Sequence, residues 1–173
     1  MPALAPPIST AFTVADEILK IAKRKGLDIT PMQLLKLVYI AHGWSLAILN
    51  RDLFPDRIEA WKYGPVIPDL YRATKSFGRG AIPHQMIRDD QPSPLPDDVQ
   101  AFLEDVVEKY GRLSGIALSN LTHRAGSPWS QVYETGAYNG EITDDLIRDH
   151  YVSKLNDRRR PAARGDEVSA LGN

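Results

Sequence analysis

The stretch ITPMQLLKLVYIAHGWSLAILN, residues 29–50, decides how this chain folds. Thr30, Pro31 and Gln33 form the pattern of a helix start, with a hydroxyl cap, a proline at the first helical position and a glutamine three residues after the cap. From Met32 to Leu49 nearly every side chain is apolar, and the few polar ones fall on one line of the helix. A helix that is apolar on most sides belongs in the middle of a bundle. We therefore expect this segment to be the central helix of the fold.

Shorter helices are predicted on both sides of the central one, because apolar residues recur there at helical spacing behind polar caps or prolines. The expected ranges are 13–25 with Thr13 as the cap, 68–77, 97–110, 114–124, 127–134 and 143–155. Aromatic and β-branched residues over 58–63 favour an extended strand, and Glu141-Ile142 a second short one. The predicted fold is all-α in the main, a compact domain of about six or seven helices with at most a small β element.

One domain accounts for most of the 173 residues, a length that can bury a real core. We expect this domain to span residues 13–155, after an N-terminal extension over residues 1–12. Residues 156–173, NDRRRPAARGDEVSALGN, show no helical periodicity and few large apolar side chains. A disordered C-terminal tail is therefore predicted.

Composition limits the classes of protein. Hydrophobic residues make up 43% of the chain and charged residues 25%, as in ordinary soluble globular proteins. The formal net charge of -1 gives no overall field that would attract nucleic acid or an anionic membrane. The absence of cysteine excludes disulfides, thiolate nucleophiles and thiolate-bound metals. The sequence shows neither a secretory signal nor the roughly 18 uninterrupted apolar residues of a membrane helix. We expect a soluble protein of the cytoplasm.

Motifs for catalysis and metal binding are not found in the sequence. The histidines are His42, His84, His123 and His150, and no two of them have the spacing of metal ligands on a helix. Neither a glycine-rich phosphate loop nor a nucleophile-elbow pattern occurs. We therefore predict no metal, no cofactor and no enzymatic activity, with His42 as a hydrogen-bonded residue of the core or of a cleft.

A helix-turn-helix DNA-binding regulator is the alternative interpretation. The helices predicted at 13–25 and 31–49 have the spacing of that motif, whose second helix must present polar side chains to bases. Here the second helix offers only Gln33 and Lys36 near its start. Nonspecific phosphate contacts would come from arginines of the predicted tail, namely Arg158, Arg159, Arg160 and Arg164. Nucleic-acid binding is therefore the less favoured of the two readings.

The stretch IEAWKYGPVIPDLY, residues 58–71, predicts a strand, a rigid proline corner and a helix start. Four residues would form this structural corner: Trp61, Gly64, Pro65 and Pro68. In a strand, Trp61 and Tyr63 point to one face of the backbone and Lys62 to the other. We expect Trp61 to pack into the core, and Lys62 and Tyr71 to reach solvent.

Three stretches, LLKLVYIAHGWSLAI, IEAWKYGPVIPDLY and THRAGSPW, resemble successive blocks of the SocA-like antitoxins, also called the Panacea domain and formerly the GepA family. The second block is the most specific, because its order of residue types is unusual. The resemblance extends over residues 13–155 and implies a mostly α-helical antitoxin of a bacterial toxin–antitoxin pair, without catalytic residues. Such an antitoxin neutralises its cognate toxin by direct protein contact, and members occur in prophages and mobile elements. In the SocA branch, the resemblance further implies a proteolytic adaptor that delivers the toxin to a Clp-type ATP-dependent protease. Adaptor and plain neutraliser both remain open, since both need only a toxin-binding surface.

The toxin-binding surface is predicted at two turns, because turns on a rigid scaffold commonly carry recognition. One turn follows Trp61 and the other is THRAGSPW, residues 122–129. We expect them to lie together and to form a groove over the polar line of the central helix. The predicted partner-binding residues are Tyr39, His42, Lys62, Tyr63, Tyr71, His123, Arg124 and Trp129.

Overall fold

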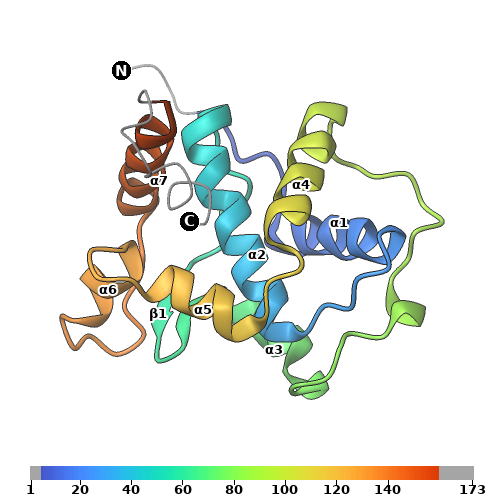
Figure 1. Cartoon of the computed structure of the whole chain (residues 1–173), viewed down its shortest axis with the longest axis horizontal. Coiled ribbons are helices and arrows are strands. Elements are labelled where there is room, and N and C mark those ends of the chain that lie inside the picture. The colour runs from blue at the N-terminus through green and yellow to red at the C-terminus, as the bar shows by residue number, and fades with distance from the viewer. Residues whose placement is uncertain (1–4, 160–173) are drawn as a thin grey trace, which may run out of the picture.

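The computed structural model describes residues 5–159, which form seven α-helices and one small β-hairpin (Figure 1). The helices are α1 (Ala11–Arg24), α2 (Pro31–Trp44), α3 (Pro68–Thr74), α4 (Asp97–Tyr110), α5 (Gly115–His123), α6 (Pro128–Tyr133) and α7 (Asp144–Arg159). The shorter helical turns are η1 (Ser45–Leu49), η2 (Lys75–Phe77) and η3 (His84–Met86), and the strands are β1 (Glu59–Trp61) and β2 (Gly64–Val66). The predicted, mainly α-helical architecture is confirmed.

Helix α2 is the centre of the fold. It contacts α1, α3, α4, α5 and α7, and Figure 1 shows it with α1 and α4 on one side and α7 on the other. Twelve of its fourteen residues are buried. Together with η1 it is long and apolar enough to cross a membrane by composition, but 72% of its most apolar window is buried inside the protein, as in a core helix.

Two local features, a glycine in α2 and a π-helical turn after it, shape how α2 packs against its neighbours. At Gly43 a Cβ atom would overlap the ring of Tyr151, so the glycine is what lets α7 pack closely against α2. The same ring lies edge-on to Trp44, with 5.0 Å between the ring centroids. Beyond Trp44 the helix widens into the π-helical turn η1, which ends at Asn50 in the left-handed conformation. Tyr151 and η1 thus form the junction between α2 and α7.

Most predicted helix starts are confirmed. Thr30 and Gln33 form a full capping box at α2. Ser114 and Ser127 accept hydrogen bonds from the third residue beyond them, and Thr143 does so with the N–H of Leu146. The predicted start of the first helix is wrong: α1 begins at Ala11, because the Thr10 hydroxyl accepts from the Thr13 N–H, and Thr13 lies inside the helix.

The two ends of the folded chain also differ from the predicted boundaries. Helix α1 begins two residues inside the predicted extension 1–12. At the other end α7 continues to Arg159, so residues 156–159 of the predicted tail are helical. Residues 160–173, the rest of that tail, lie outside the described residues.

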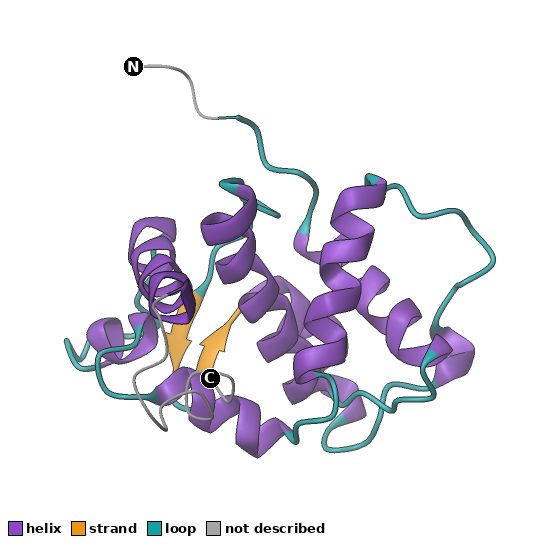
Figure 2. Cartoon of the chain, turned by 45° about the horizontal axis from the view of Figure 1, so that its top comes forward, coloured by secondary structure: helices purple, strands orange, loops and turns teal. Residues whose placement is uncertain are grey.

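The predicted strand 58–63 is shorter and belongs to a hairpin (Figure 2). Strands β1 and β2 pair antiparallel, with Trp61 opposite Gly64, so Lys62 and Tyr63 form a two-residue turn instead of continuing the strand. The second predicted strand is reduced to a single bridge, in which Glu141 pairs with Glu59. Gly64 and Pro65 of the predicted proline corner therefore lie in the second strand of a hairpin.

Candidate functional site

The hairpin is held against the core by polar contacts from two helices. The ammonium of Lys36 on α2 donates to the carbonyl oxygen of Pro65 at 3.1 Å. The hydroxyl of Ser119 on α5 donates to the carbonyl oxygen of Tyr63. Gly64 has φ +121°, and a Cβ there would come within 2.8 Å of Lys36 Cε. Only glycine adopts this backbone without strain, so Gly64 fixes the shape of the turn.

Lys36 itself is unusual, because a lysine ammonium rarely lies in a core. Its side chain is 2% exposed, although the sequence places it on the polar line of α2. Burial lowers the pKa of Lys36 from 10.5 to about 8. The hairpin therefore depends on a costly polar contact inside the core.

The second predicted turn lies beside the hairpin. The indole N–H of Trp129, on α6, donates to the carbonyl oxygen of Trp61 at 2.6 Å. His123, at the end of α5, packs its ring on Trp129 with 4.2 Å between centroids. Burial, and then the charge of Lys36, lower the pKa of His123, which favours the neutral imidazole. The two turns that were expected to lie together do so.

Trp61 packs against the start of α3. Its ring meets Tyr71 edge-on at 4.9 Å, and its indole N–H donates to Glu59 Oε1 at 3.0 Å. Pro68 is the first residue of α3, and Gly64 and Pro65 are buried, as a structural corner requires. Trp61 is only partly buried, because side chains alternate between the two faces of β1 and Ala60 is the one that points into the core.

Large aromatic side chains of these turns are open to solvent. Tyr63 is 61% exposed at the tip of the hairpin, and Tyr133 is 41% exposed on α6. Tyr133 stacks on Trp129 with centroids 4.5 Å apart and an interplanar angle of 17°. We call the surface formed by Trp61, Tyr63, Tyr71, Trp129 and Tyr133 the aromatic face. Lys62 and Arg124 are exposed beside it.

Tyr133 was not among the predicted residues. A signal for it exists, because Trp129 and Tyr133 are four residues apart and so share one side of a helix. Tyr138, 92% exposed in the loop after α6, was missed as well, and its local sequence ETGAYNG indicates only a loop.

Tyr39 and His42 are each 1% exposed, so neither lines a groove as expected, whereas the prediction of His42 as a buried, hydrogen-bonded residue is confirmed. Tyr39 packs edge-on to Tyr151 with 6.4 Å between centroids, and burial raises the pKa of its hydroxyl. His42 stacks on Phe54 at 4.3 Å. The line of polar residues on α2 is therefore covered by other elements instead of lining a groove: Lys36 contacts the hairpin, whereas Tyr39 and His42 contact α7.

His42 belongs to a separate polar cluster with Asp52 and Asp144. Its Nε2 lies 2.8 Å from Asp144 Oδ1 at the start of α7, and one ligand-type atom from each residue lies within 4.8 Å of the others. Burial and the neighbouring Asp144 raise the pKa of Asp52, whereas the hydrogen bond from His42 lowers the pKa of Asp144.

The donor types of this cluster match those of a zinc site, but the surroundings of His42 do not. A metal-bound histidine normally donates its other ring N–H, and His42 Nδ1 is buried without a partner among the described residues. The cluster therefore fits a hydrogen-bonded clamp between α2, the loop after η1 and α7.

A polar cleft borders the aromatic face at Trp61. Its charged lining residues are Asp56, Arg57, Glu59, Asp69 and Arg72. Arg57 bridges Glu59 at 2.9 Å and Glu141 at 3.0 Å, and Arg72 pairs with Asp69. The charged groups of the cleft are thus largely engaged with one another.

Comparisons with known proteins show the family of the chain. Residues 34–130 match the family model described as antitoxin SocA-like, Panacea domain. The chain is 32% identical over 153 residues to antitoxin SocA of Caulobacter vibrioides (strain NA1000 / CB15N), which covers 82% of this chain and 81% of that protein. No solved structure matches the chain. By the extent of the family match and by this relative, the chain belongs to the SocA-like antitoxin family, whose domain is called Panacea.

Proposed function

We propose that this protein is an antitoxin that binds and neutralises a cognate toxin by direct protein contact, through the aromatic face. The observation that carries the proposal is the pair of exposed tyrosines, Tyr63 at 61% and Tyr133 at 41%, beside half-buried tryptophans. Exposed aromatic groups that lie together mark interaction surfaces, whereas isolated ones do not.

The physics of the aromatic face suits a protein interface. Tyrosine and tryptophan lose little rotamer freedom on binding and bury a large area, so they often dominate binding energy. Here they are also ordered in advance, since Trp129 is held by Trp61 O on one side and by the stacked Tyr133 on the other. Lys62 and Arg124 supply charged donors at the border, where they direct encounter more than they add affinity.

The proposal has two extensions. The first is that the bound toxin is delivered to a Clp-type ATP-dependent protease in the cytoplasm. The second is that no catalytic step is involved. A degradation assay with the purified protease, toxin and antitoxin separates an adaptor from a plain neutraliser, because only an adaptor shortens the lifetime of the toxin.

The DNA-binding alternative has less support. Reading bases requires a helix with several polar side chains free to enter the major groove. In α2, by contrast, twelve of fourteen residues are buried, including Lys36. A promoter-binding role would have to use other elements than this helix.

Co-purification with the product of the neighbouring gene tests the proposal most directly. We expect a stable complex with the full-length protein, weakened by Tyr63→Ala and by Tyr133→Ala without a change in thermal stability. Phe12→Ala is the matched control, since Phe12 is an aromatic residue 47% exposed on α1, outside the aromatic face.

The outcomes separate the candidates. Binding that survives both tyrosine substitutions rejects the aromatic face but keeps the antitoxin function. Failure to bind the neighbouring product, together with salt-sensitive binding of the protein's own promoter, would reject the antitoxin function in favour of the regulator.

A further inference from the structure

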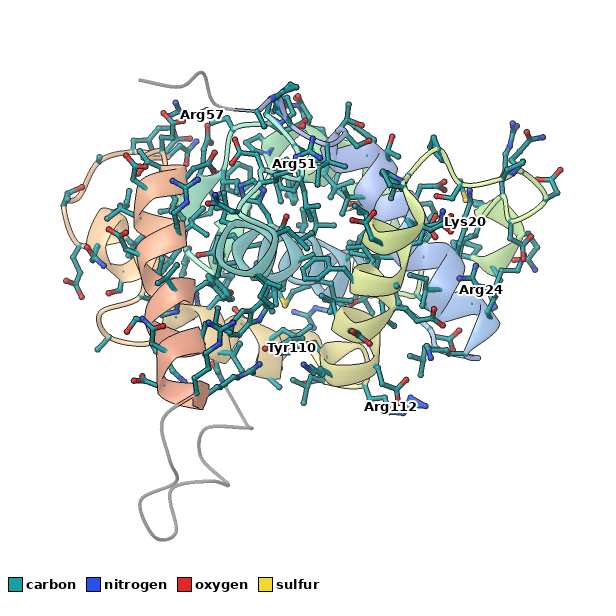
Figure 3. All side chains as sticks on the ribbon, turned by 90° about the horizontal axis from the view of Figure 1, so that it is seen from above. Lys20, Arg24, Arg51, Arg57, Tyr110 and Arg112 are labelled. Atoms are coloured by element: carbon teal, nitrogen blue, oxygen red, sulfur yellow. The ribbon has the colours of Figure 1, made fainter. Side chains whose placement is uncertain are left out.

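A second surface, on different elements from the aromatic face, is an apolar groove between η1, α4 and α7. Figure 3 shows Tyr110, the last residue of α4, between α4 and α7. Its hydroxyl accepts a hydrogen bond from the Trp44 indole at 3.0 Å. Ile48 is 51% exposed at the groove, and Phe102 is only partly buried. The lining also includes Asp98, Ala101, Asp105, Val106, Lys109 and Arg158.

The wall that α4 gives to this groove carries an ordered charge pattern. Asp98, Phe102, Asp105 and Lys109 all line it, and their spacing places them on one side of the helix. The acidic Asp98 is near the start of α4 and the basic Lys109 near its end. The neighbouring side of α4 is already used, since Glu108 pairs with Lys25 of α1 at 3.0 Å.

A helix with this pattern is complementary to an antiparallel copy of itself. In that arrangement Asp98 of one chain meets Lys109 of the other, and the reverse contact occurs at the other end, as two-fold symmetry requires. Antiparallel pairing also sets opposite ends of the helix dipoles side by side. In the same register Phe102 of each chain lies opposite Asp105 of the other, and Ala101 lies opposite Val106, on either side of the symmetry axis.

We infer that this groove is the interface of a symmetric homodimer, in which α4 of each copy lies in the groove of the other. The interface buries Ile48 and Phe102, and two Asp98–Lys109 pairs flank its centre. Arg158, already stacked over Trp44 at 4.4 Å, borders the groove opposite α4 and faces the acidic half of the entering helix. The aromatic face stays free in such a dimer, so each copy keeps one toxin-binding surface.

The molar mass of the full-length protein without toxin, measured by light scattering over a concentration series, is the primary test. We expect a dimer for the wild type and a monomer for Ile48→Glu. Ile116→Glu is the matched control, because Ile116 is an equally large aliphatic residue, 72% exposed on α5. Circular dichroism and thermal unfolding confirm that each variant is folded. A monomeric wild type, or a dimer that survives Ile48→Glu, overturns the inference.

A charge exchange tests the antiparallel register. Asp98→Lys alone sets two lysines against each other, and Lys109→Asp alone sets two aspartates against each other. Each variant should dimerise at least about tenfold more weakly than the wild type. A mixture of the two variants restores both attractive pairs and should form heterodimers with wild-type affinity. Failure of the mixture to associate better than either variant alone rejects this register.

Discussion

Replacing Lys36 by methionine should stabilise the protein at neutral pH. The Lys36 side chain is 2% exposed, and its ammonium donates to the carbonyl oxygen of Pro65 at 3.1 Å. Methionine is also unbranched and fills the same space without a charge. The change therefore removes the cost of a buried charge and the benefit of one hydrogen bond.

The size of the stabilisation follows from the cost of the buried charge and the benefit of the hydrogen bond. Burial lowers the Lys36 pKa from 10.5 to about 8. At about 1.4 kcal/mol per pKa unit, that shift corresponds to a penalty of roughly 3 kcal/mol for the charged form at pH 7. Leaving the carbonyl oxygen of Pro65 without its donor costs about 1–2 kcal/mol. The methionine variant should thus be more stable by about 1–2 kcal/mol at pH 7.

The pH dependence gives a sharper criterion than the sign at one pH. Between pH 8 and 10.5 the unfolded chain keeps a proton on Lys36 that the folded chain has released. The free energy of unfolding of the wild type must therefore rise with pH across this window. Below about pH 8, the folded protein carries the full penalty for burying the charged ammonium. The Lys36→Met variant has no titrating group at this position, so its free energy of unfolding lacks this part of the rise with pH.

Urea unfolding followed by tryptophan fluorescence, at about pH 7, 8.5 and 9.5, measures both quantities. The advantage of Lys36→Met should shrink as the pH increases. Lys62→Met controls for the loss of a surface charge, because Lys62 is exposed at the hairpin turn. A stability difference that stays constant over this pH range would refute the burial argument.

Further predictions concern α2, the polar clamp and the aromatic face. Gly43→Ala should destabilise the protein by about 2 kcal/mol in thermal unfolding, because its methyl group overlaps the Tyr151 ring; Gly80→Ala, where the nearest atom is 3.3 Å away, should not. Asp144→Asn should lower the unfolding temperature at neutral pH. That difference should disappear as the pH falls through the lowered pKa of Asp144, since the wild-type carboxyl then loses its charge as well. A difference that persists in acid would contradict this role. Arg124→Ala should weaken toxin binding at unchanged stability, whereas Tyr71→Ala should also lose stability through its contact with Trp61; unchanged toxin affinity in both variants would exclude this side of the surface.

Local signals in the sequence were enough to predict the helical framework. The capping box of Thr30 and Gln33 and the apolar run behind it are contained within the helix they define. The same holds for Ser114 and Ser127, whose hydroxyls bond to neighbouring backbone groups. Such features need no knowledge of distant residues.

The candidate site could be predicted only in part, because it depends on distant contacts. Polar residues on a helix look the same whether they face solvent or another helix. His42 faces Asp144, a residue 102 positions further along the chain. The hairpin was missed because its turn, Lys62-Tyr63, lacks the Asn-Gly or Asp-Gly pair that marks such turns. Contacts from Lys36 and Ser119 hold it in place instead.

The hydrogen bond from Trp129 to Trp61 joins residues 68 positions apart in the chain. The surface proposed to meet the toxin is thus a discontinuous epitope, completed only after the hairpin has docked on α2 and α5, and α6 on α5 and β1. A linear peptide copied from residues 58–71 or from residues 122–133 would lack half of it, and would also lack the supports that set the turn. A minimal mimic of this antitoxin therefore has to present the hairpin and the α6 helix as one cross-linked unit. For the same reason, a single proteolytic cut between them that lets the halves separate would abolish recognition in one step.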